Sequence, residues 1–238
     1  MPEPFLYERL DGAASMGMLK TDIPDSIRQN LNPAFALRPY QVAAFSRFLY
    51  CYQNDFPGKS YPLHFLFNMA TGSGKTLLMA GLILYLYEQG CRNFLFFVNS
   101  TNIIEKTRDN FLNSASIKYL FNQYLTIGQR RVELTAVDNF EGANPAAINI
   151  CFTTIQKLHS DLTTEKENAL TFEDFRKHRV VLIADEAHHI NVQTKSALNL
   201  VESWENTVQR IFEQNEDNLL LEFTATHDYA TPAMVEKY

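Results

Sequence analysis

The sequence predicts an α/β fold, with a doubly wound and mostly parallel sheet flanked by helices. Two observations support this fold class. Strand-like and helix-like segments alternate along the chain, as they do in βαβ units. Several strand-like segments are continuous apolar runs without polar alternation, which is typical of parallel strands covered on both faces. With 238 residues, of which 46% are hydrophobic, the chain can bury a sizeable core.

The expected elements follow one another in a regular order. The strand candidates are residues 62–68, 93–99, 132–137, 148–154, 179–185 and 218–224. The helix candidates are residues 37–53, 75–89, 103–112 and roughly 196–214, where apolar side chains recur at helical spacing or crowd together. In such sheets the reactive groups lie on loops at the carboxyl ends of the strands. A functional motif should therefore directly follow a strand.

The remaining segments are more polar. Residues 1–36 are rich in Pro, Asp and Asn, which predicts an N-terminal arm of irregular or short helical structure. Residues 37–238 are expected to form one α/β domain. Residues 138–147 and 160–170 are polar and rich in turn-forming residues, so we expect surface loops there.

Composition limits the partners and the compartment. The 21 basic and 27 acidic residues give a formal net charge of -6, without a basic cluster, so any grip on nucleic acid by this chain is expected to be weak. Cys51, Cys91 and Cys151 form no CxxC pair, which favours buried free thiols in a reducing compartment. The longest apolar run, Leu77 to Tyr87, is too short to cross a bilayer. We expect a cytoplasmic protein with no membrane partner.

The strongest motif is MATGSGKT, residues 69–76, which lies between a predicted strand and a predicted helix. Glycines allow backbone N–H groups to surround a phosphate, and the start of the helix adds a positive dipole. The ammonium of Lys75 would reach the β and γ phosphates of ATP, and the hydroxyl of Thr76 would bind Mg²⁺. The general pattern has glycine where this chain has Met69. The residues expected to surround the nucleotide are Thr71, Gly72, Ser73, Gly74, Lys75 and Thr76.

A pair of carboxylates, Asp185 and Glu186, closes the apolar segment RVVLIAD. Such a pair at the end of a strand suits a magnesium site. Asp185 would hold the ion, through water, while Glu186 would polarise the attacking water. These two residues and Lys75 are the predicted catalytic groups.

The order of these motifs resembles that of the helicase superfamily 2 ATPases, which have a RecA-like fold. MATGSGKT is similar to their motif I, and Asp-Glu-Ala-His at residues 185–188 is similar to their motif II. The resemblance implies that His188, Thr224 and Thr226 couple the ATP site to nucleic-acid movement. It also implies that Gln41, in LRPYQ, reads the adenine edge with Arg38 nearby; a polar residue on an amphipathic helix is the alternative for Gln41.

Two further segments are similar to the strand-contact motifs of that superfamily. The residues concerned, which follow the strand candidates 93–99 and 148–154, are Ser100, Thr101, Thr154 and Gln156. Their hydroxyl and amide groups could donate to phosphate oxygens without reading bases. The alternative is that the hydroxyl residues are ordinary helix N-caps.

Within the superfamily, the motifs look most like the motor part of type III restriction (Res) subunits. The resemblance implies an ATP- and Mg²⁺-dependent DNA translocase or helicase, with duplex DNA and a methyltransferase (Mod) subunit as partners. A superfamily 2 motor has a second RecA-like domain that supplies an arginine. Only twelve residues follow Thr226, so we expect a first half that hydrolyses ATP slowly by itself. No nuclease motif is evident.

Three other functions fit part of the pattern. An RNA helicase would carry the same tetrapeptide at 185–188. A nucleotide-dependent switch or assembly module would bind ATP with little hydrolysis, although Glu186 argues against it. A small-molecule kinase would need an acceptor pocket and a basic lid, and neither is evident in the sequence.

Overall fold

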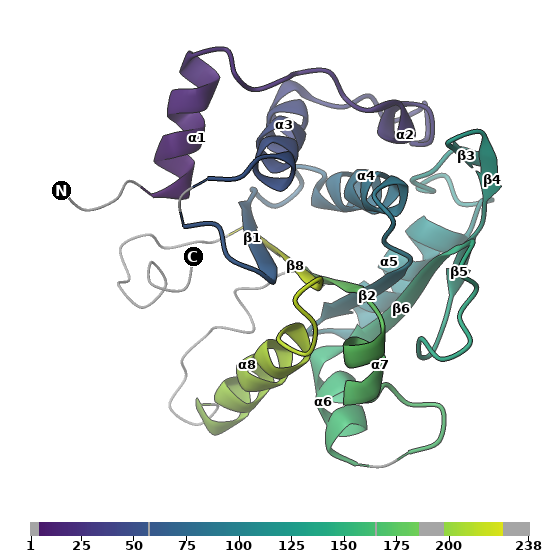
Figure 1. The fold of residues 1–238 in the computed structure, drawn as a ribbon. Coiled ribbons are helices and arrows are strands. Elements are labelled where there is room, and N and C mark those ends of the chain that lie inside the picture. Colours follow the sequence, from purple (N-terminus) through teal and green to yellow (C-terminus); the bar gives the residue numbers. More distant parts are fainter. Residues whose placement is uncertain (1–4, 57, 165, 186–197, 226–238) are drawn as a thin grey trace.

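The structure is a computed structural model that describes residues 5–56, 58–164, 166–185 and 198–225 (Figure 1). Among these residues, no helix is long and apolar enough to span a membrane.

A six-stranded sheet forms the centre of the molecule, in the order β1-β8-β7-β2-β6-β5. Every neighbouring pair in it is parallel. The strands are β1 (Leu63–Asn68), β2 (Asn93–Val98), β5 (Leu134–Ala136), β6 (Ile148–Thr154), β7 (Val180–Asp185) and β8 (Leu219–Thr224). The predicted doubly wound, mostly parallel sheet is confirmed.

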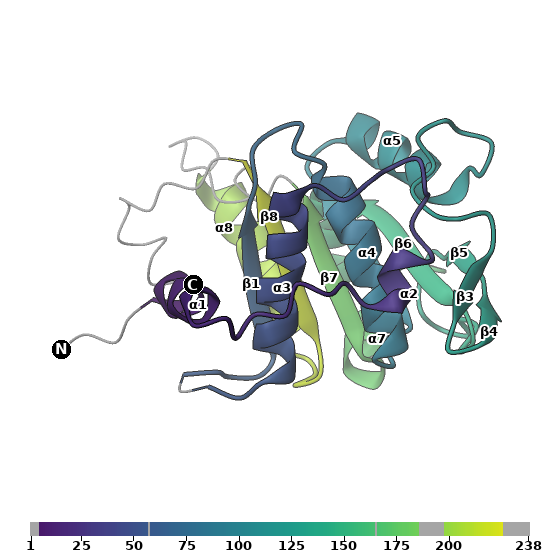
Figure 2. The same ribbon diagram turned by 90° about the horizontal axis from the view of Figure 1, so that it is seen from above.

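Helices cover both faces of the sheet (Figures 1 and 2). One face carries α3 (Pro39–Gln53), α4 (Lys75–Glu88) and α5 (Thr101–Leu112). The opposite face carries α6 (Ile155–Thr163), α7 (Phe172–Lys177) and α8 (Leu198–Phe212). Each face has its own cluster of buried apolar side chains. Strands such as β2, β7 and β8 are buried along their whole length, which explains their uninterrupted apolar sequences.

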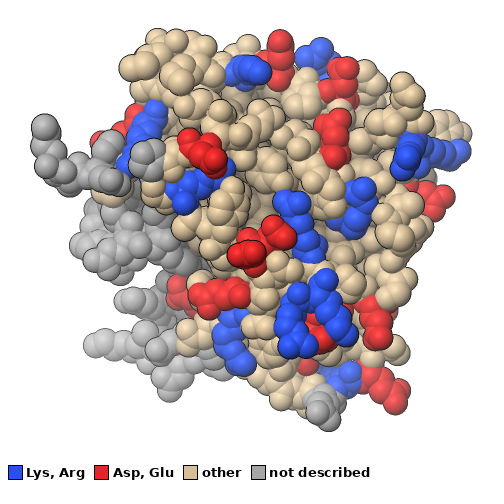
Figure 3. All heavy atoms as spheres, viewed as in Figure 1, with Lys and Arg blue, Asp and Glu red and all other residues tan. Residues whose placement is uncertain are grey.

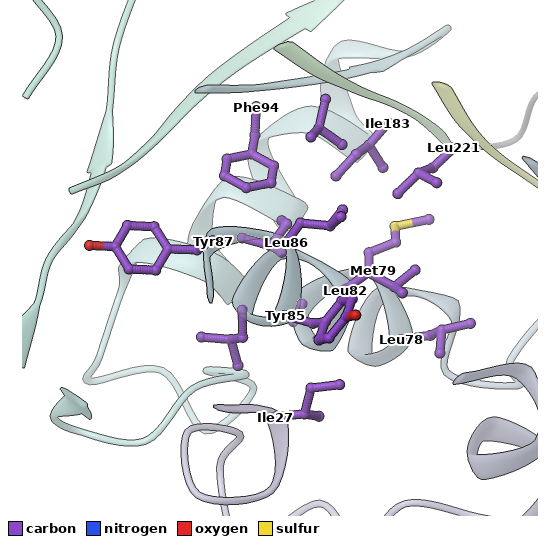
Figure 4. Close-up of a cluster of buried hydrophobic side chains, with 14 of the residues drawn as sticks. Ile27, Leu78, Met79, Leu82, Tyr85, Leu86, Tyr87, Phe94, Ile183 and Leu221 are labelled. Carbon is purple, nitrogen blue, oxygen red and sulfur yellow. The ribbon is translucent and has the colours of Figure 1, made fainter. Parts of the chain in front are cut away.

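Helix α4 lies at the centre of the first cluster. Its side chains are apolar on nearly all sides, because the sheet lies on one side and α2 and α3 lie on the other (Figure 4). Gly81 allows the close approach of α3, since a Cβ at this position would lie 2.4 Å from Cζ of Phe45. The helix that follows the phosphate motif is therefore firmly held in the core.

One buried side-chain amide connects the elements around the second cluster. Asn218, which is 2% exposed, donates from Nδ2 to the carbonyl oxygens of Phe175, Ile211 and Phe212, at 3.2 to 3.3 Å. Its Oδ1 accepts the N–H of Val180 at 2.9 Å. A single side chain thus joins α7, the end of α8 and the start of β7.

The N-terminal residues form two short helices that pack against the domain. These are α1 (Leu6–Ser15) and α2 (Asp25–Arg28), with Ile27 fully buried against the core. The amide of Asn30 bonds both backbone groups of Thr126, at 2.6 Å and 2.9 Å, across 96 residues of sequence. Residues 29–32 are therefore fixed to the segment 119–126.

The structure differs from the sequence prediction in several short elements. The strand predicted at 132–137 is divided between β4 (Arg130–Val132) and β5. Strand β4 pairs with β3 (Leu125–Ile127) in a hairpin that turns through left-handed Gly128 and Gln129. Helix α6 extends to Thr163, into the segment where a loop is expected, and α7 is a short helix that the sequence pattern does not indicate.

The three thiols are buried and free, as expected from their spacing. Burial raises the pKa of Cys51 and Cys91 to about 11 and that of Cys151 to about 12. The reactive thiolate is then a very small fraction at pH 8. We expect all three thiols to resist Ellman's reagent in the folded protein at pH 8 and to react together in denaturant. Rapid reaction of any thiol without denaturant would contradict this burial.

Candidate functional site

Three strands bring the predicted site residues to one edge of the sheet. In the pairing register, Asn68 at the end of β1 lies opposite Thr224 of β8, and Asp185 at the end of β7 lies opposite Phe223. Neighbouring strands are about 4.8 Å apart, so the ends of β1 and β7 are roughly 10 Å apart across β8. The phosphate motif and the carboxylate motif therefore follow strands that end on both sides of β8.

The loop between β1 and α4 has the backbone that a phosphate cradle requires. Gly72 (φ 74°) and Gly74 (φ 81°) are both left-handed, and Gly74 is the N-cap of α4. Within the loop, Ser73 N–H donates to the carbonyl of Ala70 at 3.1 Å. The first N–H groups of a helix have no acceptor inside the helix, so the start of α4 offers donors to an anion.

Lys75 begins α4 and is only 7% exposed. Its Nζ donates to the carbonyl oxygen of Met69 at 3.3 Å, so the side chain lies back over the loop. Met69 is 9% exposed and packs into the first apolar cluster. It is not among the described residues with positive φ, so this position does not require glycine. Methionine is therefore compatible with the cradle.

The loop residues fit a phosphate group. Thr71, Gly72 and Gly74 are exposed, and a Cβ at Gly72 would meet no atom within 4 Å. Ser73 Oγ is buried and has no hydrogen-bond partner among the described residues. Thr76, at the second position of α4, is half-buried. Open space, a buried ammonium and an unsatisfied hydroxyl together suit an oxyanion.

Asp185 is 8% exposed at the end of a fully buried strand. Glu186, His188 and Thr226 lie outside the described residues. Among the described residues, no three His, Cys, Asp or Glu side chains cluster as a ready-made metal site. This does not conflict with a magnesium site, because Mg²⁺ is commonly held by one or two protein oxygens together with phosphate and water.

The start of α3 contacts the phosphate loop directly. The hydroxyl of Tyr40 donates to the carbonyl of Ser73 at 2.8 Å, and Nη1 of Arg38 donates to the Tyr40 hydroxyl at 3.1 Å. Nε2 of Gln41 donates to the carbonyls of Ser73 and Gly74, at 3.1 Å and 3.2 Å. Arg38 and Gln41 were expected in this site. Tyr40 was not, because a tyrosine at the start of an amphipathic helix gives no signal of its contact.

A cavity of about 930 Å³ adjoins the loop. It is bounded by α1, by α3 from its first residues to Cys51, by β1 and by residues 69–73. Arg38 and Tyr40 line it, together with Phe5 and Tyr7, whose rings are stacked 5.8 Å apart. Its volume is within the range of small-molecule sites.

The loop is also joined to β8. The N–H of Met69 donates to the carbonyl of Thr224 at 2.8 Å, directly after the last paired residues of the two strands. Thr224 itself is 2% exposed. A backbone hydrogen bond therefore links the first residue of the phosphate loop to the end of β8.

The predicted strand-contact residues come together at the ends of β2 and β6, which are paired. The Nε2 group of Gln156 donates to both the side chain and the carbonyl of Asn99. Thr154 Oγ1 accepts the N–H of Lys157 at 3.2 Å, so it is an N-cap of α6. Ser100 is the N-cap residue of α5 without a side-chain cap bond, and Thr101 and Gln156 are exposed.

The charged side chains are mixed on the face seen in Figure 3. Lysine and arginine alternate there with aspartate and glutamate over the described residues, without a broad basic area on that face. This matches the net charge of -6. Electrostatic attraction to nucleic acid would therefore be small on this face.

Comparison with known families decides the assignment. A family model described as type III restriction enzyme, res subunit, matches residues 34–228. The chain belongs to this family. The probable HindVIP Res subunit of Haemophilus influenzae is 39% identical over 231 residues, which cover 86% of this chain and 44% of that protein. This Res-family chain thus spans less than half the length of that relative.

Solved structures with a similar arrangement include the UvsW helicase of bacteriophage T4, with 13% identity and a TM-score of 0.47, over 85% of this chain and 57% of that one. Another is the SWI2/SNF2 ATPase core of Sulfolobus solfataricus in complex with double-stranded DNA, with 15% identity and a TM-score of 0.44. That similarity covers 81% of this chain and 32% of the other.

Proposed function

We propose that this chain is an ATP-binding and ATP-hydrolysing motor domain of a DNA translocase or helicase, within the Res subunit of a type III restriction-modification system. The observation that carries the proposal is the phosphate loop. In this Res-family chain the loop follows β1, which pairs with β8. Its glycines Gly72 and Gly74 are left-handed, and the helix that comes next begins with buried Lys75. Residues 37–238 would form the motor domain, with residues 1–36 as its N-terminal arm.

The nucleotide would be held by its phosphates. The N–H groups at the start of α4 and the ammonium of Lys75 would neutralise the β and γ phosphates. Thr71, Gly72, Ser73 and Gly74 would form the wall of the cradle. Thr76 and Asp185 would hold Mg²⁺, which, when bound, stabilises the negative charge that develops on the phosphoryl oxygens. Arg38 lines the adjoining cavity, on the side where we propose that the base lies.

Hydrolysis would need groups beyond those described. We propose that Glu186 orients the attacking water and that His188, Thr224 and Thr226 pass the nucleotide state on to the nucleic-acid contacts. The hydrogen bond from Met69 N–H to the Thr224 carbonyl supports a link of this kind. A second RecA-like domain of the parent protein would supply an arginine, and hydrolysis by this chain alone is expected to be slow.

Duplex DNA is the proposed track. Ser100, Thr101, Thr154 and Gln156 would contact its backbone, and they lie at the ends of two paired strands. The hydroxyl of Thr154 already accepts a capping hydrogen bond in α6. Thr101 and Gln156 are the stronger candidates for DNA contact, because both side chains are exposed. With mixed surface charge, a second motor domain or a methyltransferase (Mod) subunit is the proposed source of most DNA affinity.

The test is a calorimetric titration of this chain with Mg-ATP, with Mg-ADP and with AMP. A site that recognises the β and γ phosphates should bind Mg-ATP and Mg-ADP, and should bind AMP at least about tenfold more weakly. Removal of magnesium with a chelator should weaken ATP binding but leave AMP unaffected. Equal affinity for AMP and Mg-ATP would contradict a phosphate-directed site.

A hydrolysis assay with and without duplex DNA then separates the motor from a switch. In the full-length Res protein, Glu186→Gln should abolish DNA-stimulated turnover while nucleotide binding is kept. Unchanged turnover in that variant would contradict the proposed role of Glu186 and favour a nucleotide-dependent assembly module.

A further inference from the structure

Two side-chain amides meet where β2 and β6 end. Asn99 directly follows β2, and Gln156 is the second residue of α6, which directly follows β6. The two strands are paired, with Val98 opposite Thr154. Asn99 also leads into α5, which covers one face of the sheet, whereas α6 covers the opposite face (Figure 1). The amides therefore meet at the carboxyl edge of the sheet, between the segments proposed above as DNA contacts.

The hydrogen bonds of this pair determine which atoms face each other. The Nε2 group of Gln156 donates to the backbone carbonyl of Asn99, at 3.4 Å, and also to its side-chain Oδ1. A backbone carbonyl can only accept a hydrogen bond, so the atom of Gln156 beside it must be the nitrogen. An amide nitrogen can only donate, so the side-chain atom of Asn99 that faces it must be the oxygen. Both contacts support the same orientation of the two amides.

This orientation leaves one donor and one acceptor available to a ligand. The oxygen and nitrogen of an amide diverge from the same carbon, so turning Oδ1 of Asn99 toward Gln156 turns its Nδ2 away. Within the described part of the chain, neither this Nδ2 nor Oε1 of Gln156 makes a hydrogen bond. Asn99 is half-buried and Gln156 is exposed. The donor that remains belongs to Asn99, and the acceptor that remains belongs to Gln156.

Only the donor suits a phosphate. The phosphate oxygens of nucleic acid accept hydrogen bonds from side chains. Nδ2 of Asn99 can donate to such an oxygen, whereas Oε1 of Gln156 would face it with a second acceptor. The nitrogen of Gln156 is already directed to two oxygens of Asn99. Gln156 can therefore support a backbone contact through Asn99 without donating to the phosphate itself.

We propose that Asn99 donates a hydrogen bond to the DNA backbone, and that Gln156 is a positioning residue that holds the Asn99 amide in the donating orientation. The proposal rests on the proposed function, because it assumes a duplex DNA track at the ends of β2 and β6. It specifies how Gln156 contributes there. An amide that is oriented before DNA arrives avoids part of the ordering cost of the contact. The contact is independent of base sequence, since it is made to phosphate.

The experiment is a double-mutant cycle on the full-length Res protein. Asn99→Ala removes the donor, and Gln156→Met keeps the length of the side chain but removes the two hydrogen bonds that orient Asn99. A third protein carries both changes. In a fourth, Asn99→Asp keeps an oxygen toward Gln156 and replaces the donor by a charged oxygen. Fluorescence anisotropy measures the affinity for two duplexes of unrelated sequence, at several salt concentrations.

Gln123→Met is the matched control. Gln123 is also an exposed glutamine, and it lies in the segment just before β3. Strands β3 and β4 lead into the start of β5, which is parallel to β6. The start of β5 is therefore at the opposite edge of the sheet from the ends of β2 and β6. This variant should bind both duplexes like the unmodified protein.

We expect Asn99→Ala to weaken duplex binding about tenfold, as for the loss of one hydrogen bond to a charged acceptor. Gln156→Met should weaken it about threefold to fivefold, because a released Asn99 amide donates in only some of its orientations. In the double variant the loss should stay at about tenfold, since Gln156 then has nothing to position, whereas independent contacts would give about thirtyfold to fiftyfold.

Two further readouts separate a phosphate contact from other roles. Asn99→Asp should weaken binding more than Asn99→Ala, because its charge repels the phosphate. The slope of affinity against salt concentration should be unchanged in Asn99→Ala and Gln156→Met, since neither removes a cation. Both duplexes should lose affinity equally. Melting temperatures without DNA identify any variant that has lost its fold, and Asn99→Asp tests the donor again if Asn99→Ala has.

Losses that multiply in the double variant would overturn the proposal, because Gln156 would then contact DNA by itself. Unchanged binding by folded Asn99→Ala or Asn99→Asp would overturn it as well, and so would a loss confined to one of the two duplexes. If the unmodified protein bound no duplex DNA, the proposed track would fail and the proposal with it. That result is distinct from multiplied losses in a protein that binds.

Discussion

Replacing Lys75 by alanine is expected to lower the affinity for Mg-ATP at least about a hundredfold, which corresponds to about 2.8 kcal/mol. The ammonium is 7% exposed and lies over the loop, 3.3 Å from the Met69 carbonyl. Alanine would remove a charge-assisted donor to the phosphates from a site with little access to water, where such bonds are strong. Calorimetric titration of both proteins measures the difference directly.

The matched control is Lys59→Ala. Lys59 is also a buried lysine whose ammonium donates to backbone carbonyls, those of Asn54 at 2.9 Å and Tyr52 at 3.3 Å. It precedes β1, however, and so lies at the opposite end of that strand from the phosphate loop. Its variant should bind Mg-ATP like the unmodified chain. Similar losses in both variants would indicate a general effect on the fold, and binding by Lys75→Ala within about threefold would exclude a phosphate role for this lysine.

Replacing Asn218 by aspartate is expected to reduce the free energy of unfolding by about 4 kcal/mol at pH 7.5. The Nδ2 group that donates to three carbonyl oxygens would become an oxygen, and a buried carboxylate would face those carbonyls. Burial and these oxygens would hold the pKa of the new carboxyl above the usual aspartate range. The loss should therefore be smallest at low pH and grow as pH rises through that raised pKa. Urea unfolding at pH 5 and at pH 7.5 measures both effects.

Asn215→Asp serves as the comparison. Asn215 is half-buried, and its Nδ2 makes a single 3.3 Å bond to the carbonyl of Arg176. Its variant should lose less than about 1 kcal/mol and should show little dependence on pH. Equal stability of Asn218→Asp and Asn215→Asp would mean that the buried amide does not hold the second cluster together.

The long elements could be predicted from sequence because their patterns are strong. The strand candidates 93–99 and 179–185 agree with β2 and β7 to within a residue, since their apolar runs reflect burial on both faces. The β3–β4 hairpin and α7 could not be predicted in the same way. They are three to six residues long. Distant partners fix them, as when Asn30 holds Thr126, and no local pattern records such contacts.

The candidate site, too, could be predicted from the sequence only in part. Gly72, Gly74 and Lys75 are recognisable because phosphate binding demands those residue types at that spacing. The hydrogen bond from Tyr40 to the phosphate loop joins residues 33 apart in sequence. Its physical basis is the position of α3 beside the loop, which only the packed structure reveals. The acceptability of methionine at position 69 likewise depends on its backbone angle and its burial.

The bonds between Asn30 and Thr126 also bear on how the chain folds during synthesis. A contact that closes 96 residues carries a larger entropy cost than the helix and strand contacts enclosed within that loop. Because synthesis proceeds from the N-terminal side, Asn30 and Leu31 are made long before Thr126 and Phe121, their partners in the folded chain. Asn30 and Leu31 must therefore wait for residues 119–126 before these contacts can form, and until then the segment around Leu31 lacks its native partners.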